Sequence, residues 1–137
     1  MEFKLSYEVA EDQLKQLFDY YDLAIDDQLE SQKVVLEAAS KRLIKAIRRG
    51  NLEISMDDGL TVTQNLVRPP GGVNTIKYRV VDGRSKTAMA DKKETDQYGK
   101  IYAVMGSLSG IGEAGIKGLT GQDLSIVETL GIVFLQV

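Results

Sequence analysis

Two spacings of apolar residues divide the chain into helical and extended regions. Helical spacing, in which apolar residues recur every three or four positions, predicts a first helix from about Glu11 to Tyr21. A longer helix is expected over residues 28–49, where Gly50 stands at the position of a terminating glycine. Alternating spacing predicts a short strand over residues 2–9, with an extended arm ahead of the helix as the alternative.

The middle of the chain alternates between apolar and polar positions, as half-buried strands do. Strands are expected over residues 52–56, 60–66, 76–80 and, more weakly, 85–89. Asp57-Asp58-Gly59 and Asp82-Gly83 supply turns between successive strands, and the two prolines of the 68–72 segment place a loop there. This region therefore predicts an antiparallel meander of three to four strands.

The last third returns to helical spacing. A helix is expected over residues 98–108, followed by short helical turns joined at glycines and a final helix after Thr120. Thr120 and Asp123 resemble a capping box at the start of that helix. The apolar positions of the final helix are Leu124, Val127, Leu130, Gly131, Phe134 and Leu135. This ending is either a packing surface or a docking surface, and its pattern is compatible with both.

Helices, then hairpins, then helices indicate the α+β class, because an alternating order would be needed for a parallel sheet. We expect one domain over residues 1–137, with N-terminal helices in 1–50, a central antiparallel meander in 51–89 and C-terminal helices in 97–137.

Composition narrows the chemistry open to the chain. Its 137 residues include no cysteine, histidine or tryptophan, which removes disulfides, thiolate metal sites, the usual general base and most zinc sites. We therefore expect no enzyme, and we assign no catalytic, cofactor-binding or metal-binding residue. The net charge of -3 provides no general basic field, so we expect no nucleic-acid partner.

The sequence also lacks the patterns of membrane targeting. The first residues contain no basic region followed by an apolar core, so we expect no signal peptide. The longest apolar run, residues 130–135, is far shorter than the ~20 residues that span a bilayer. We expect a cytoplasmic protein without a membrane partner.

Three short motifs suggest functions that their surroundings do not favour. Residues 110–115 match the GxGxxG fingerprint of dinucleotide sites, but no βαβ unit fits around them, and tight helix corners are the better interpretation. The basic end of the 28–49 helix is better interpreted as a solvated face that offsets the helix dipole than as a nucleic-acid contact. The pairs Asp26/Asp27 and Asp57/Asp58 lack the spacing of a calcium loop.

One resemblance covers a little over half the chain. The matching features are the segments VRPPGG and IKYRVVDGR, then a polar helical stretch, then an apolar ending with Leu108-Ser109-Gly110-Ile111, Asp123-Leu124 and Phe134-Leu135. In this order they resemble the small tail assembly chaperones of long-tailed bacteriophages and prophages, from about Leu60 to Leu135. The resemblance implies a non-enzymatic protein of the host cytoplasm that binds the long helical tape measure protein and recruits tail tube subunits.

The first hypothesis is thus a chaperone-like binding module that acts in tail assembly by binding other tail proteins. The candidate partner-binding residues are Leu124, Val127, Leu130, Phe134, Leu135 and Tyr20. The alternative is a structural virion subunit, a tail or head-completion component that associates with copies of itself. A third possibility, a carboxylate-based enzyme or small-molecule binder, requires a concave site that gathers two or more of Asp57, Asp58, Asp82, Asp91 and Glu94.

Overall fold

The computed structural model describes residues 3–137. The elements follow in the order α1 (Tyr7–Tyr20), the 3-10 turn η1 (Ile25–Asp27), α2 (Glu30–Arg48), β1 (Leu52–Ser55), β2 (Thr61–Asn65), β3 (Thr75–Tyr78), α3 (Gly83–Thr87), α4 (Gln97–Ser109), α5 (Gly112–Lys117) and α6 (Gly121–Phe134). Helices at both ends and a central antiparallel sheet confirm the α+β class.

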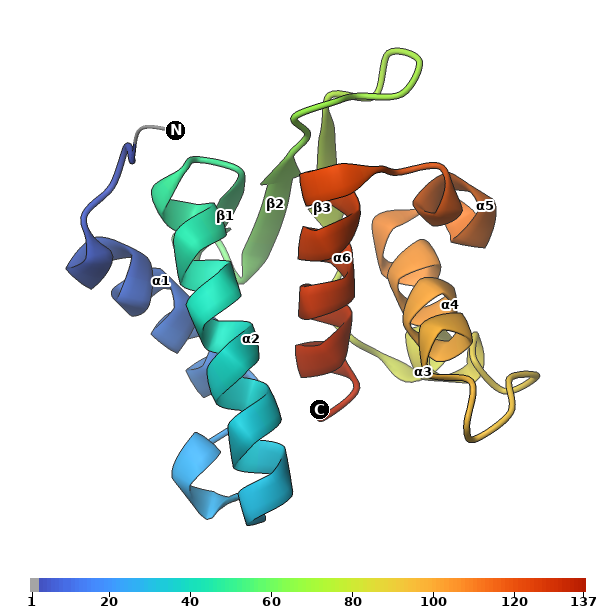
Figure 1. The fold of residues 1–137 in the computed structure, drawn as a ribbon, viewed down its shortest axis with the longest axis horizontal. Helices are drawn as coiled ribbons and strands as arrows, with labels where there is room; N and C mark the ends of the chain where they lie inside the picture. Colours follow the sequence, from blue (N-terminus) through green and yellow to red (C-terminus); the bar gives the residue numbers. More distant parts are fainter. Residues whose placement is uncertain (1–2) are drawn as a thin grey trace.

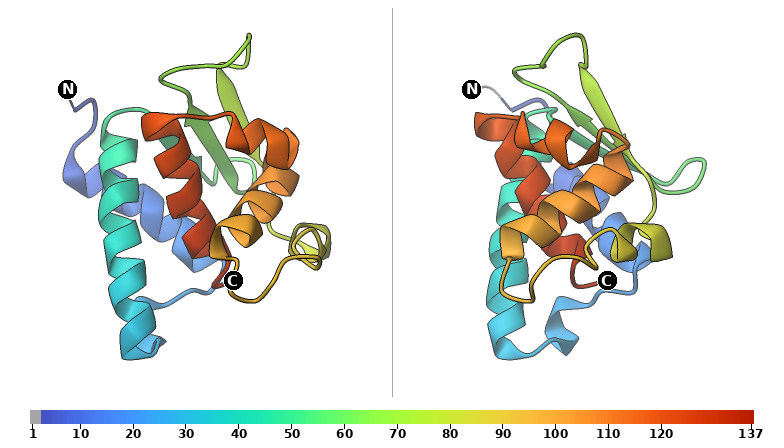
Figure 2. Two further views of the ribbon diagram at one scale, coloured as in Figure 1. Left: turned by 45° about the vertical axis from the view of Figure 1, so that its right-hand side comes forward. Right: turned by 90° about the vertical axis from the view of Figure 1, so that its right-hand side faces the viewer.

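The elements form two layers. In Figure 1, α6 lies between α2 and α4, α1 lies on the far side of α2, and the sheet stands behind the upper part of these helices. The side views agree, with the helices gathered on one side of the strands (Figure 2). The N-terminal end of α2 and the turn before it project beyond the ends of α4 and α6.

The sheet has the order β1-β2-β3, and both pairings are antiparallel. Leu52 and Ile54 of β1, Val62 of β2 and Ile76 of β3 are buried against the helices. The alternate positions, such as Glu53, are polar and line the open face. One covered face and one open face are what the alternating sequence pattern predicts for an antiparallel sheet.

The final helix is part of the core. Val127, Leu130, Val133 and Phe134 are all at most 3% exposed. Its neighbour α4 approaches so closely that a Cβ atom added at Gly131 would lie 2.6 Å from Cγ2 of Ile101. An α6 enclosed between α2 and α4 therefore explains both the dense apolar sequence of this helix and its internal glycine.

A buried polar network fixes the start of α6 to the sheet. The Tyr78 hydroxyl donates to the side-chain oxygen of Gln64, whose amide nitrogen donates to the backbone oxygen of Asp123. The Asp123 carboxylate accepts from the amides of Val67 and Arg68 at 2.7 and 2.8 Å. Burial raises the pKa of Tyr78, so its hydroxyl remains a donor across the neutral range.

This network corrects the predicted capping box at Thr120 and Asp123. The Thr120 side chain makes no capping hydrogen bond, and the Asp123 carboxylate is directed to the loop after β2. A carboxylate three residues after a threonine has the spacing of a capping box, but two loop amides in a buried setting are competing partners that the local sequence does not reveal.

Two predicted strands were wrong. The α1 helix begins at Tyr7, because the Ser6 hydroxyl accepts from the Val9 amide as a helix N-cap. Residues 3–6 form an arm whose Lys4 and Leu5 amides donate to the Arg48 carbonyl at the end of α2, in keeping with the extended-arm alternative. The weak strand at 85–89 is instead helix α3.

The cause of the second error is a capping box. Asp82 accepts from the Ser85 amide at 3.0 Å, and the Ser85 hydroxyl accepts from the Asp82 amide at the same distance. This reciprocal pair starts α3 at Gly83, so Asp82-Gly83 is a helix start rather than a hairpin turn. The hydrogen bond from Ser85, together with Arg84, lowers the pKa of the Asp82 carboxyl.

Candidate functional site

An apolar depression lies between α1 and α2, and we name it the α1–α2 groove. It encloses about 560 Å³. Its floor is formed by apolar side chains of α1, of the connection after α1 and of α2, namely Leu14, Phe18, Leu23, Ile25 and Ile44. Because α1 and α2 meet along these residues, the floor of the groove is part of the packed core and is held rigidly.

The rim of the groove is mainly acidic. Four carboxylates, those of Glu11, Asp19, Asp26 and Glu37, stand around it with two lysines. Lys15 forms an ion pair with Asp19 at 2.6 Å, and the hydrogen bond from this pair raises the pKa of Lys15. Apolar floor and acidic rim together match the surface of an amphipathic segment whose polar side is basic.

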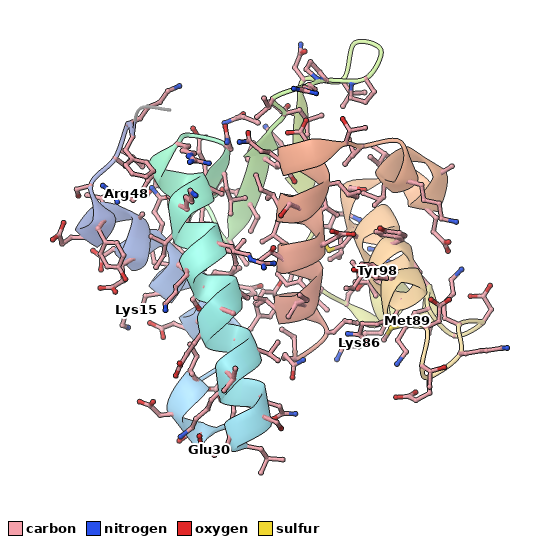
Figure 3. The ribbon with its side chains drawn as sticks, in the orientation of Figure 1. Lys15, Glu30, Arg48, Lys86, Met89 and Tyr98 are labelled. Atoms are coloured by element: carbon pink, nitrogen blue, oxygen red, sulfur yellow. The ribbon has the colours of Figure 1, made fainter. Side chains whose placement is uncertain are left out.

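The apolar surface continues toward the projecting end of α2, which Glu30 marks in Figure 3. Val34 precedes two groove residues, Glu37 and Lys41, by three and seven positions, so all three lie on one side of the helix. Val34 is 65% exposed and Leu29, just before the helix, is 72% exposed. Val34 therefore places an exposed aliphatic side chain on the groove side of α2, although neither Val34 nor Leu29 is among the residues that line the groove.

The predicted partner-binding residues are not gathered at one place. Val127, Leu130 and Phe134 are buried in the core, and in this conformation they contribute no docking surface. Leu124 and Leu135 are half-buried and pack against the core. The physical reason is the position of α6 between α2 and α4, a long-range arrangement that its own sequence does not encode.

Tyr20 is the most accessible of the six predicted residues, at 44% exposure. Its ring meets that of Tyr21 edge to face, with centroids 5.0 Å apart. Tyr21 faces inward, where its hydroxyl accepts from the Val81 amide and burial raises its pKa. Of the two adjacent tyrosines, one faces the core and one the surface, as the sequence suggested. Tyr20 is not part of the α1–α2 groove.

Two of the five carboxylates considered for catalysis, those of Asp82 and Glu94, have structural partners. Asp82 caps α3 and pairs with Arg79 and Arg84, and Glu94 pairs with Lys100. Asp57 and Asp58 lie in the turn between β1 and β2. Across residues 3–137, no group of three or more acidic side chains is placed to hold a metal ion.

The GxGxxG segment joins two helices. Gly110 ends α4 in the left-handed conformation at φ 77°, and Gly112 begins α5 at φ 76°. The element before the motif is a helix rather than a strand, so the geometry of a dinucleotide site is not formed here.

No family model, no curated protein and no solved structure matches the chain. Of the helices within residues 3–137, none has both the length and the apolar character needed to cross a bilayer.

Sequence spacing does not reveal the α1–α2 groove. Phe18 and Ile44 fall in the apolar stripes of two helices and are buried, but the space above them depends on the angle between these helices. A signal was present in Leu29 and Val34, two aliphatic residues outside the main stripe of the 28–49 helix.

Proposed function

We propose that this chain is a non-enzymatic binding module that holds an amphipathic, basic segment of another protein in the α1–α2 groove. The observation that carries the proposal is the combination of an apolar floor, an acidic rim and the exposed Val34 in line with it. Helix-in-groove recognition uses this arrangement, in which apolar anchors enter the groove and charges at the rim set the orientation.

The resemblance to tail assembly chaperones suggests which partner the groove binds and where. In that reading the partner is another tail protein, the tape measure protein or a tube subunit, and the chain acts in the host cytoplasm during tail assembly. A long helical partner fits a groove formed between two helices. The proposed docking face is the α1–α2 groove, with Tyr20, Leu124 and Leu135 as peripheral candidates, rather than the buried side of α6.

The test is co-expression of the chain with the products of its neighbouring genes, followed by size and mass determination of the purified complex. The variant D26K/E37K reverses two exposed rim charges, and E53K, which reverses one exposed charge of the same sign on the open face of the sheet, is the control. Loss of the complex with D26K/E37K and retention with E53K are expected, with unchanged circular dichroism in both.

Two outcomes would contradict this proposal. A complex that forms equally well with D26K/E37K would place the docking face elsewhere. A chain that assembles by itself into rings or filaments, without any partner, would favour the alternative of a structural virion subunit.

A further inference from the structure

A second concave surface lies on the opposite side of α2 from the α1–α2 groove. It is a pocket of about 380 Å³ between the C-terminal half of α2 and the N-terminal half of α6. Arg42, Lys45 and Arg49 line one wall, and their spacing of three and four residues places them on one side of the helix. Gln122 and Ser125 of α6 stand opposite.

The charge in this pocket is of one sign. Three basic side chains line it, and no carboxylate is among its lining residues. Within residues 3–137, none of the three pairs with an acidic side chain, whereas Lys15, Lys33, Lys92 and Lys100 all do. The nearby Asp123 carboxylate is already bonded to the amides of Val67 and Arg68 and is not part of the lining.

Arg49 is the least exposed of the three basic residues. Its Nε atom is buried and has no hydrogen-bond partner in the part of the chain that the structure describes. A buried donor without an acceptor is costly, especially on a charged group, and such atoms require an explanation. The Nε atom of the neighbouring Arg48, in contrast, donates to the Leu5 carbonyl. Both guanidinium groups lie over the Phe3 ring, at 3.9 Å from its centre for Arg48 and 5.8 Å for Arg49. Figure 3 marks Arg48 near the C-terminal end of α2.

The opposite wall adds neutral donors. The Ser125 side chain is exposed, as is the Gln122 amide in the first turn of α6. The Thr120 side chain makes no capping hydrogen bond in this turn. Arginines, a lysine, a hydroxyl and an amide are the donor set that proteins use for tetrahedral oxyanions.

We infer that the α2–α6 pocket binds a phosphate group, which Arg42, Lys45 and Arg49 hold together with Ser125 and Gln122. The inference is independent of the proposed docking function, because the α1–α2 groove uses the other side of α2. The apolar side chains of Ala46 and Ile126 at the pocket floor leave room for an organic group beyond the phosphate.

The experiment is a titration of the folded chain with inorganic phosphate at constant ionic strength, followed by backbone amide NMR shifts. Saturable shifts confined to α6 residues 122–129 and to the C-terminal half of α2 are expected. The variant R42Q/K45Q replaces two exposed side chains and is expected to weaken binding about tenfold or more. K41Q, one residue away on the groove side of α2, removes one positive charge outside the pocket; this control should bind phosphate within about twofold of the parent chain.

Further arms separate the sources of the phosphate and the role of Arg49. Glycerol phosphate tests whether an ester binds in place of the free ion, and a single-stranded oligonucleotide tests a nucleic-acid backbone. R49M removes the unpartnered Nε and should weaken phosphate binding. If R49M does not fold, the phosphate affinity of R42Q/K45Q tests the inference. Shifts that do not saturate, that K41Q reduces as much as R42Q/K45Q, or that only the oligonucleotide produces would overturn the inference.

Discussion

Substitution of Gly106 and Gly131 by alanine gives the sharpest test of the packing around α4. Helix propensity predicts that each substitution raises the free energy of unfolding, whereas close packing predicts that it lowers it. Glycine in a helix interior costs about 1 kcal/mol relative to alanine, so a free-standing helix would gain that amount from G106A or G131A. In this fold, however, both positions lie where another element passes within contact distance. We expect both substitutions to destabilise the chain.

The magnitudes follow from the neighbouring atoms. A Cβ at Gly131 would lie 2.6 Å from Cγ2 of Ile101, a β-branched and buried side chain with little rotamer freedom. Overpacking of this kind costs about 1–3 kcal/mol, which exceeds or cancels the propensity gain and leaves G131A about 0–2 kcal/mol less stable. A Cβ at Gly106 would lie 2.6 Å from two backbone atoms, C of Gly112 and N of Glu113. Backbone cannot rotate away, so G106A should lose about 2 kcal/mol or more.

Gly118 supplies the matched control. Its φ is −80°, and the nearest atom to an added Cβ is a backbone oxygen at 3.5 Å, an ordinary contact. G118A should therefore raise the free energy of unfolding by about 0.4–1 kcal/mol through the entropy of the unfolded chain. Urea unfolding monitored by circular dichroism, with m values checked for constancy, measures all three variants. A G106A variant at least as stable as the parent chain would refute the close packing of α4 and α5.

Four further perturbations test other parts of the molecule. Deletion of residues 122–137 should abolish folding. The buried apolar side chains of α6 contribute about 1.5–3 kcal/mol each, and their sum is comparable to the stability of a whole domain. A cooperative urea transition in the truncated chain would show that α6 is dispensable. D123N should lower the free energy of unfolding by about 2–4 kcal/mol, since an asparagine has one acceptor oxygen for two amides; an unchanged melting temperature would argue against the network. The hydrogen bond that Tyr102 donates to Glu128 raises the Tyr102 pKa to about 12. Its contribution to the stability of the fold is therefore complete below the ordinary tyrosine pKa and is lost as pH rises through about 12. E128Q should lower the Tyr102 pKa in an ultraviolet titration, and identical titration curves for E128Q and the parent chain would contradict the assignment. D22G should stabilise the chain by about 0.5–1 kcal/mol, because residue 22 has a φ of 53° after the end of α1; a loss in a thermal melt would mean that the aspartate side chain compensates.

Sequence pattern was sufficient where the controlling forces are local. The hairpin of β1 and β2 followed from alternation on either side of Asp57-Asp58-Gly59, and the register places Ile54 opposite Val62 on the covered face. The helical spacing of apolar residues predicted α2, and the terminating glycine at position 50 predicted where the helix ends. The errors at the Ser6 cap and at the Asp82–Ser85 capping box arose where side-chain hydrogen bonds compete with alternation, and those signals were legible in the sequence.

The sequence by itself determined the α+β class, the helices at both ends, the three-stranded meander between them and the apolar faces of these elements, because backbone propensity and burial act over a few residues. Only the tertiary structure decided that α6 is enclosed between α2 and α4, that Asp123 bonds to the loop after β2 and that α2 has an apolar groove on one side and a basic pocket on the other. Each of these depends on residues far apart in the chain, such as Gln64 and Asp123, and the distance between such residues is fixed by packing angles that no local spacing encodes.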